Sequence, residues 1–282
     1  MSGAPHLPYL VVSLYTLRQH WPGDVVVCAW PQSIELVRTI AKDQRLDVRS
    51  VAWPQTHFGR NSQFLSKVDL MCHKNVIGCD TALYLDADTI ICGDVQPLLT
   101  MGSNALALTQ FNDWTTWQGI IRRRLVRMIG KEPIDQHAVN RLLTESWPSV
   151  NGGVFACPRG LNALDVWRTW SESLRGIFIC DETALHAIMV KYPHEPSVLC
   201  GGSFNCSPKY KPKTLRDEDV VIWHFHGDSN VRPNKSQRGV DLWYPVYQEC
   251  VAQNIGGIAD WKDSCGNKYL DQLETFVRTG HG

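Results

Sequence analysis

Residues 82–89 read ALYLDADT and carry the most informative pattern in the sequence. The apolar half of this segment predicts a strand that ends at two carboxylates, Asp86 and Asp88. In an open α/β sheet, ligands bind beyond the carboxyl ends of the strands. Side chains at i and i+2 share one face of an extended chain, so both carboxylates can bind one cation. Mg²⁺ and Mn²⁺ prefer carboxylate and phosphate oxygens. The segment therefore predicts a divalent metal site, against the alternative of two solvated turn aspartates.

Helical and strand patterns alternate before this segment. Apolar residues at helical spacing over 7–17 predict an amphipathic helix. The β-branched run 24–29 predicts a strand buried on both faces. A second helix is expected from Ser33, a plausible N-cap, to residue 40, and a second strand over 48–53. This alternation indicates an α/β fold with right-handed crossovers.

The same alternation continues towards the C-terminus. Strands are expected at 89–92, 104–110, 150–157 and 220–225, and helices at 64–73, 161–174 and 184–189. A Pro-, Asn-, Lys- and Gly-containing stretch over 228–239 reads as a linker. We therefore expect one main domain over residues 1–227 and a C-terminal extension over 228–282 that packs on the same domain.

Composition excludes several classes of protein. The 282 residues carry 28 Lys and Arg against 28 Asp and Glu, and 44% are hydrophobic. Such a chain is too apolar for intrinsic disorder and lacks the excess of cations that a nucleic-acid binder needs. It shows neither a run of about 18 apolar residues, as a membrane span requires, nor a signal peptide. We therefore expect a cytoplasmic protein whose cysteines are free thiols.

One basic stretch stands out. Residues 119–131, GIIRRRLVRMIGK, carry four Arg and one Lys among Ile, Leu, Val and Met. The plain interpretation is a surface helix whose Arg stems cover apolar surface. The functional alternatives are contact with an acidic acceptor or peripheral contact with an anionic membrane surface.

Three further motifs carry chemistry. In WHFHGD, residues 223–228, His224 and His226 share a strand face, and a neutral imidazole can be a third metal ligand. Gly227 allows close approach of backbone to a phosphate. Each His alone is more often structural. Because an Asp-x-Asp segment lies at another strand end, metal binding becomes the favoured interpretation for one of the two histidines.

The other two motifs open an apolar strand and a helix. In SVNGGV, residues 149–154, Asn151 offers both a donor and an acceptor to sugar hydroxyls, and Gly152 and Gly153 permit close approach of a ligand. A glycine bulge explains them equally well. Asp181 and Glu182 begin a helix, where carboxylates commonly complement the dipole. Their functional interpretation is a sugar-hydroxyl acceptor and a carboxylate facing an oxocarbenium-like centre.

Together and in this order, the four motifs resemble those of the GT-A nucleotide-sugar glycosyltransferases, most closely glycosyltransferase family 8, the glycogenin and bacterial galactosyltransferase group. The resemblance covers roughly residues 7–227. It implies a mixed, mainly parallel Rossmann-like sheet flanked by helices. Family members place a strand before the first helix. Here only six residues precede that helix, so we expect the strand to be missing.

The resemblance also implies the ligands of the metal and the donor. Asp86, Asp88 and His224, the first His of HFHG, would hold Mn²⁺ or Mg²⁺. Lys67, which follows Ser66 as in the family's Ser/Thr-Lys helix, would approach the phosphates or the sugar.

The remaining family positions bind the sugar. The segment 151–154 matches the family's N-x-G-V strand, which includes Asn151, Gly152 and Gly153. Asp181 would hold sugar hydroxyls and Glu182 would lie near the anomeric carbon. Glu182 departs from the Gln usual in the family, and a carboxylate there could act as a nucleophile or stabilise developing positive charge.

A second departure concerns the donor diphosphate. The family's Lys-Pro-Trp after HFxG is absent, and Arg232 or Lys235 would take its place. Arg and Lys are not interchangeable at such a site, so the clamp on the diphosphate differs from the family pattern.

These features predict a metal-dependent glycosyltransferase that moves a hexose from a nucleoside-diphosphate sugar, most simply a UDP-sugar, to an unknown acceptor. Retention at the anomeric carbon is implied by the resemblance alone. The alternative is a catalytically weak GT-A-like module that binds sugar or nucleotide. A nucleotidyltransferase would need a Gly-rich, Arg- or Lys-bearing phosphate loop, which residues 1–14 lack.

Overall fold

The computed structural model describes residues 6–54, 62–72, 78–110, 122–177, 179–191, 197–226, 236–265 and 268–279. These residues form two compact units, each built from separate stretches of the chain. Unit 1 comprises Met1–Pro54, Asp86–Asp94 and Cys206–Gly282, and unit 2 comprises Gln55–Leu85 and Val95–Asn205. The predicted division at residue 228 stays a prediction.

Unit 1 combines the first elements of the chain with the last. Its α-helices are α1 (Leu7–His20), α2 (Ile34–Ala41), α9 (Gln237–Ala252), α10 (Ile258–Trp261) and α11 (Lys268–Thr279). Its strands are β1 (Val26–Ala29), β2 (Arg49–Ala52), β4 (Thr89–Ile91) and β8 (Ile222–His224). Short 3₁₀ turns are η2 (Pro31–Ser33), η5 (Asp217–Asp219), η7 (Ile255–Gly257) and η8 (Lys262–Cys265). Strand β1 pairs in parallel with β2, and β4 pairs in antiparallel with β8.

Helix α1 confirms the first predicted helix, but the prediction that it is amphipathic is wrong. Residues on all of its sides are buried, including the polar Ser13. The Ser13 hydroxyl lies 2.8 Å from that of Thr89 in β4. The ring of Tyr9 packs 4.9 Å from that of Trp243 in α9. The buried Ser13 hydroxyl thus has a hydrogen-bond partner from another element in place of water.

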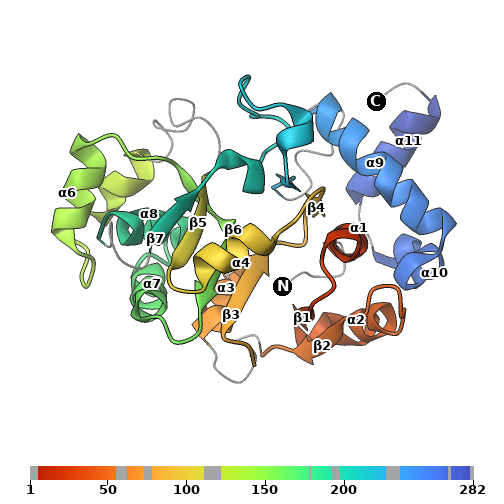
Figure 1. The fold of residues 1–282 in the computed structure, drawn as a ribbon, viewed down its shortest axis with the longest axis horizontal. Coiled ribbons are helices and arrows are strands. Elements are labelled where there is room, and N and C mark those ends of the chain that lie inside the picture. Colours follow the sequence, from red (N-terminus) through yellow and green to blue (C-terminus); the bar gives the residue numbers. More distant parts are fainter. Residues whose placement is uncertain are drawn as a thin grey trace. The chain divides into compact units, whose positions relative to one another are not determined.

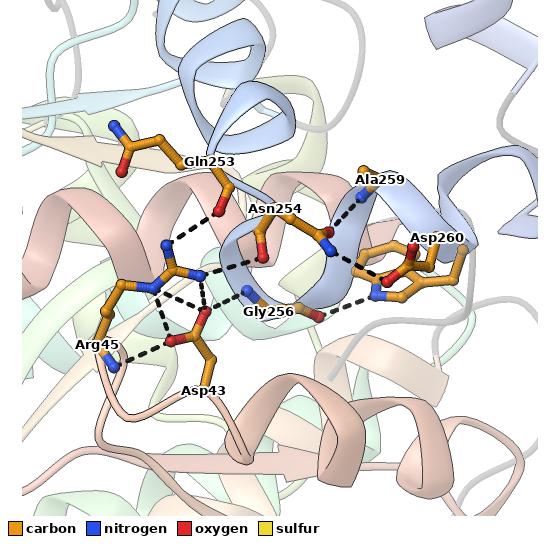
Figure 2. Close-up of polar contacts among 8 residues, drawn as sticks. Asp43, Arg45, Gln253, Asn254, Gly256, Ala259 and Asp260 are labelled. Atoms are coloured by element: carbon orange, nitrogen blue, oxygen red, sulfur yellow. Dashed lines mark hydrogen bonds and ion pairs between the residues drawn. The ribbon is translucent and has the colours of Figure 1, made fainter.

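A polar network fixes the turn after α2 to the turn between α9 and α10 (Figure 2). Arg45 Nη1 and Nη2 donate to the carbonyls of Gln253 at 2.9 Å and Asn254 at 3.1 Å. Asp43 Oδ2 accepts the Gly256 N–H at 2.7 Å. Hydrogen bonds from Arg45 lower the pKa of Asp43 to about 2. The helices near the C-terminus are thus tied to the first helices within unit 1.

Unit 2 contains a sheet with helices on both faces. Its helices are α3 (Ser62–Cys72), α4 (Gln96–Gly102), α6 (Gln136–Thr144), α7 (Asn162–Ser173) and α8 (Cys180–Lys191), with 3₁₀ turns η3 (Val126–Met128) and η4 (Gly202–Phe204). Its strands are β3 (Thr81–Leu85), β5 (Leu106–Gln110), β6 (Val150–Pro158) and β7 (Ser197–Cys200).

The four strands of unit 2 lie in the order β3-β6-β5-β7 (Figure 1). Strand β6 is antiparallel to both β3 and β5, and β5 is parallel to β7. Three strands therefore run in one direction and β6 runs against them. This confirms the predicted mixed sheet, although two of the three strand pairings within it are antiparallel.

Neighbouring residues of β6 show how the sheet of unit 2 is covered. The Phe155 ring meets Trp167 of α7 edge-on at 5.1 Å between centroids. A Cβ on Gly102, at the end of α4, would lie 2.5 Å from the Cβ of Ala156. Successive strand residues point to opposite faces, so α4 and α7 cover opposite faces of the sheet.

The predicted elements that fall within the described residues are present, with boundaries shifted by a few residues. Strand β1 alternates between buried and partly buried residues, so the prediction that both of its faces are buried is wrong. The sequence interpretation missed β7, α4, α6 and the helices of the C-terminal region. None of the helices in the described part of the chain has the length and apolarity that a membrane crossing demands.

Candidate active site residues

The predicted metal ligands converge in unit 1. His224 Nε2 lies 3.6 Å from Asp86 Oδ2 and 3.4 Å from Asp88 Oδ1. One ligand atom from each residue lies within 4.8 Å of the other two. His224 is buried, whereas both carboxylates are partly exposed. The structure thus brings together Asp86, Asp88 and His224, which we call the metal triad.

Strand pairing explains this convergence. Strand β4 follows the two aspartates directly, and its Thr89 pairs with His224 of β8. The Thr89 hydroxyl donates to the Asp86 carbonyl at 3.0 Å. The Phe225 N–H donates to the Asp88 carbonyl at 2.8 Å. These backbone contacts hold the segment that carries both aspartates beside the end of β8.

The donor set of the metal triad fits a divalent cation. Two carboxylate oxygens and one imidazole nitrogen are ligands that Mg²⁺, Mn²⁺ and related ions accept. Two carboxylates aimed at one point repel each other, and a cation between them removes that repulsion. The ring of His226 lies 3.9 Å from that of His224, so the two predicted histidines are neighbours.

The predicted acids of helix α8 are both buried in unit 2. Asp181 is 1% exposed and Glu182 is 7% exposed. Carboxylates that only complement a helix dipole can do so at the surface, so that role does not explain their burial. Glu182 Oε2 accepts a hydrogen bond from Asn151 Nδ2 at 2.7 Å. Glu182 Oε1 accepts one from Arg124 Nη1 at 3.2 Å. Each oxygen of this carboxylate therefore has its own donor.

Asp181 is bound on one side only. Its Oδ2 lies 3.4 Å from Lys67 Nζ. Its Oδ1 is buried and has no hydrogen-bond partner among the described residues. A Cβ added at Gly152 would lie 3.2 Å from Asp181 Oδ2, so the absence of a side chain leaves that carboxylate its room. An unpartnered buried oxygen is costly, and a ligand hydroxyl is the kind of donor that would satisfy it.

The environment of Glu182 favours its neutral form more than water does. Burial raises the pKa of Glu182 to about 7, and the charge of Asp181 acts in the same direction. Arg124, Asn151 and Lys67 lower that pKa and only partly offset burial. Glu182 is thus poised to change its charge near neutral pH.

A buried histidine supports these acids from behind. His186 Nδ1 lies 2.7 Å from the Glu182 carbonyl, and His186 Nε2 accepts the Val150 N–H at 3.3 Å. This pattern assigns the proton to Nδ1 of a neutral imidazole. Burial lowers the pKa of His186 to about 4, so the ring stays neutral at physiological pH. The first turn of α8 is thereby fixed against the start of β6.

A second network orients Asn151. Asn205 Nδ2 donates to the Thr109 hydroxyl at 2.7 Å and, more weakly, to Asn151 Oδ1 at 3.4 Å. Asn151 Oδ1 also accepts the Gly153 N–H at 2.7 Å. With its oxygen held by these donors, the Asn151 amide must turn its nitrogen towards Glu182.

The comparisons with known proteins give a fold. No protein-family model matches the sequence, and no curated protein matches it either. Solved structures do match. An active-site mutant of LgtC shares 16% identity over 88% of this chain and 94% of its own, with a TM-score of 0.59. Mouse xyloside xylosyltransferase 1, in its apo form, shares 12% identity over 79% of this chain and 93% of its own, with a TM-score of 0.53. The chain adopts the GT-A fold.

Within this GT-A fold, the predicted site residues fall into two described groups. Unit 1 holds the metal triad. Unit 2 holds the sugar-binding and catalytic candidates, namely Lys67, Asn151, Gly152, Gly153, Asp181 and Glu182. Gly227, Arg232 and Lys235 lie outside the described residues. The roles assigned to all of these residues stay predictions.

Sequence reasoning missed three residues that contact the acid pair or Asn151 in unit 2, namely Arg124, His186 and Asn205. Arg124 was one cation among five in a basic stretch, and nothing in the sequence distinguished it from its neighbours. His186 follows Glu182 by one helical turn, and that spacing was a usable signal. Asn205 precedes a Cys by one residue in an irregular segment, and no local pattern marks it.

Proposed function

We propose that the chain is a metal-dependent glycosyltransferase that takes its sugar from a nucleoside-diphosphate sugar. The observation that carries the proposal is the metal triad, three ligands suited to a divalent ion in a chain with the GT-A fold. The two solved structures with which it shares that fold are named as LgtC and as a xylosyltransferase. The name of the xylosyltransferase supports the reaction class.

In this proposal, the metal triad binds the diphosphate of the donor. Asp86, Asp88 and His224 would hold Mn²⁺ or Mg²⁺. A divalent ion held there would act as a Lewis acid and neutralise charge on the departing diphosphate. Arg232 would add a cation to the diphosphate oxygens. A UDP-sugar is the donor we propose to test first.

The residues around Asp181 would bind and polarise the transferred hexose. Asp181 Oδ1 would accept a sugar hydroxyl, which supplies the partner it lacks among the described residues. Lys67 lies near the other oxygen and holds the carboxylate in place. Gly152 leaves the space for this contact, because any side chain there would crowd Asp181. Asn151 would complete the polar wall around the sugar.

Glu182 would act at the anomeric carbon. An ionised carboxylate beside an oxocarbenium-like centre stabilises its positive charge, and in a retaining reaction it can also be the nucleophile. Arg124 and Asn151 hold the two Glu182 oxygens in fixed directions. Both donors also favour the ionised form that either role needs.

The test is release of nucleoside diphosphate from a panel of nucleotide sugars, with Mn²⁺, with Mg²⁺ and with a chelator. We expect release that requires the metal and falls by at least about 100-fold in Asp88→Asn and His224→Ala, in line with losses of about 2.7 kcal/mol or more for removed electrostatic groups. Asp24→Asn removes an exposed carboxylate of unit 1 outside the metal triad and serves as the control. Unchanged release in the triad variants would refute the metal assignment.

Calorimetry separates the proposal from its alternative. Mn²⁺ titrated into the wild type without sugar should bind, and binding should weaken in Asp88→Asn. If nucleotide sugars bind with the metal and none of the panel is turned over, with or without simple sugar acceptors, the binding-module interpretation replaces the transferase.

A further inference from the structure

The segment 122–131 of unit 2 displays a basic surface. It contains five cations and no acid. One of the five, Arg124, faces Glu182. The other four are exposed and make no ion pair with any residue that the structure describes; they are Arg122, Arg123, Arg127 and Lys131. We call residues 122–131 the basic surface.

The same surface exposes aliphatic side chains. Val126 is 51% exposed and Ile129 is 57% exposed. They are two of only three large apolar residues exposed to this degree in the described part of the chain. A monomeric soluble protein exposes single apolar residues without consequence, but here two occur within four positions and between cations.

The inner side of the segment is firmly held. Leu125 and Met128 are buried at 1% and 0% exposure. Gln136 of α6 bonds the loop that follows, since its Oε1 accepts the Gly130 N–H at 2.8 Å and its Nε2 lies 3.3 Å from the Met128 carbonyl and 3.0 Å from the Ile134 carbonyl. The exposed side chains are therefore presented from a fixed backbone, so less ordering is required when they meet a partner.

We propose that the basic surface docks the protein on an anionic lipid bilayer. Cations interleaved with aliphatic side chains match the chemistry of a membrane interface, where phosphate groups overlie acyl chains. The chain as a whole carries no net charge, so the attraction arises locally from this surface. Docking of this kind would be independent of the proposed glycosyl transfer.

The exposed aliphatic residues decide between a bilayer and other polyanions. A nucleic acid or an acidic protein segment would engage the arginines but would gain little from Val126 and Ile129, and no aromatic side chain lies within residues 122–131 to stack on a base. A bilayer uses both kinds of side chain. Binding by a bilayer should therefore depend on charge and on the aliphatic pair.

Cosedimentation of the full chain with lipid vesicles tests the proposal. Vesicles of phosphatidylcholine with phosphatidylglycerol should bind the protein, and vesicles of phosphatidylcholine alone should bind it far less. Each cation near an anionic surface contributes about fivefold in affinity, so the triple variant Arg122→Gln, Arg123→Gln, Arg127→Gln should lose about 100-fold. The double variant Val126→Ser, Ile129→Ser should lose about tenfold.

A matched triple variant supplies the control. Lys42→Gln, Arg49→Gln and Lys213→Gln remove three exposed cations of unit 1 and should leave vesicle binding unchanged. Equal loss in both triple variants would reduce the effect to general charge and overturn the proposal. So would absence of wild-type binding to anionic vesicles. The proposal would also be overturned if the protein bound polyglutamate as tightly as anionic vesicles and if the Val126 and Ile129 substitutions left that binding unchanged. An acidic polymer would then be the partner.

Discussion

Glu182→Gln should make the stability of the protein less dependent on pH. Burial raises the pKa of Glu182 from an ordinary 4.5 to about 7. The folded protein then binds a proton that the unfolded chain has released at any pH between these values. This contribution to stability is present below pH 4.5 and is lost as pH rises through 7. Between pH 5 and 8.5 the wild type loses about 2.5 kcal/mol of unfolding free energy through this group.

Glutamine keeps the shape of the protonated acid and cannot ionise. The difference in unfolding free energy, variant minus wild type, should therefore rise by about 2.5 kcal/mol between pH 5 and pH 8.5. Urea denaturation at the two pH values measures it, and titrations of other groups cancel in the difference. If the difference between Glu182→Gln and wild type is the same at both pH values, Glu182 does not titrate in this range and the reasoning about its burial is wrong.

Arg124→Gln supplies the complementary test. It removes the cation 3.2 Å from Glu182 Oε1, so the pKa of Glu182 should rise further. Breaking a buried ion pair costs about 3–5 kcal/mol when the remaining charge stays ionised. At pH 8.5 the loss should be of this size, and at pH 5 it should be much smaller because Glu182 is then protonated. Adding Glu182→Gln to this variant should abolish the pH dependence, and a loss equal at both pH values would show that Arg124 stabilises the fold by packing alone.

Three further substitutions test contacts within each of the two units. The lowered pKa of His186, about 4, stabilises the folded protein fully above about pH 6.5, and this stabilisation is lost as pH falls towards 4. His186→Gln removes the titrating group, so the unfolding free energy by which it falls short of wild type should shrink by about 3 kcal/mol between pH 7 and pH 4. Denaturation at both pH values measures the change. Gly102→Ala brings a Cβ within 2.5 Å of that of Ala156 and should lower the melting temperature by an amount equivalent to about 1–3 kcal/mol. Asp43→Ala leaves the Gly256 N–H without its acceptor and should cost about 1–3 kcal/mol at pH 7, with the difference from wild type shrinking towards pH 2 as Asp43 is protonated.

The metal triad was predictable because its first two members are local. Asp86 and Asp88 are two residues apart after an apolar strand, and that pattern alone implies convergence. His224 lies more than a hundred residues further on, and only the pairing of β4 with β8 brings it beside them. Resemblance to a family predicted His224, whereas no local pattern distinguished it from His226.

Errors in the predicted fold have the same origin. Apolar spacing predicted an amphipathic first helix, but its Ser13 is buried and hydrogen-bonds Thr89, which is distant in sequence. Helix α9 was missed although it spans 16 residues, and Pro245 lies inside it. A proline removes one backbone donor and ordinarily argues against a helix interior. Trp243 packs against Tyr9 of the first helix, and Tyr247 is buried in the same hydrophobic core, so tertiary packing supports α9 nonetheless.

The acid pair of α8 shows why burial, and not sequence, decides its role. Carboxylates at a helix N-terminus ordinarily complement the dipole from the surface. Asp181 and Glu182 are instead buried, and they face two cations, Lys67 and Arg124. A purely structural arrangement of buried charges is stabilising only when every polar atom is satisfied. Asp181 Oδ1 has no hydrogen-bond partner among the described residues, and burial raises the pKa of Glu182 to about 7. Both features weaken the folded state, and both become favourable once a polar ligand donates to Asp181 and places positive charge beside Glu182.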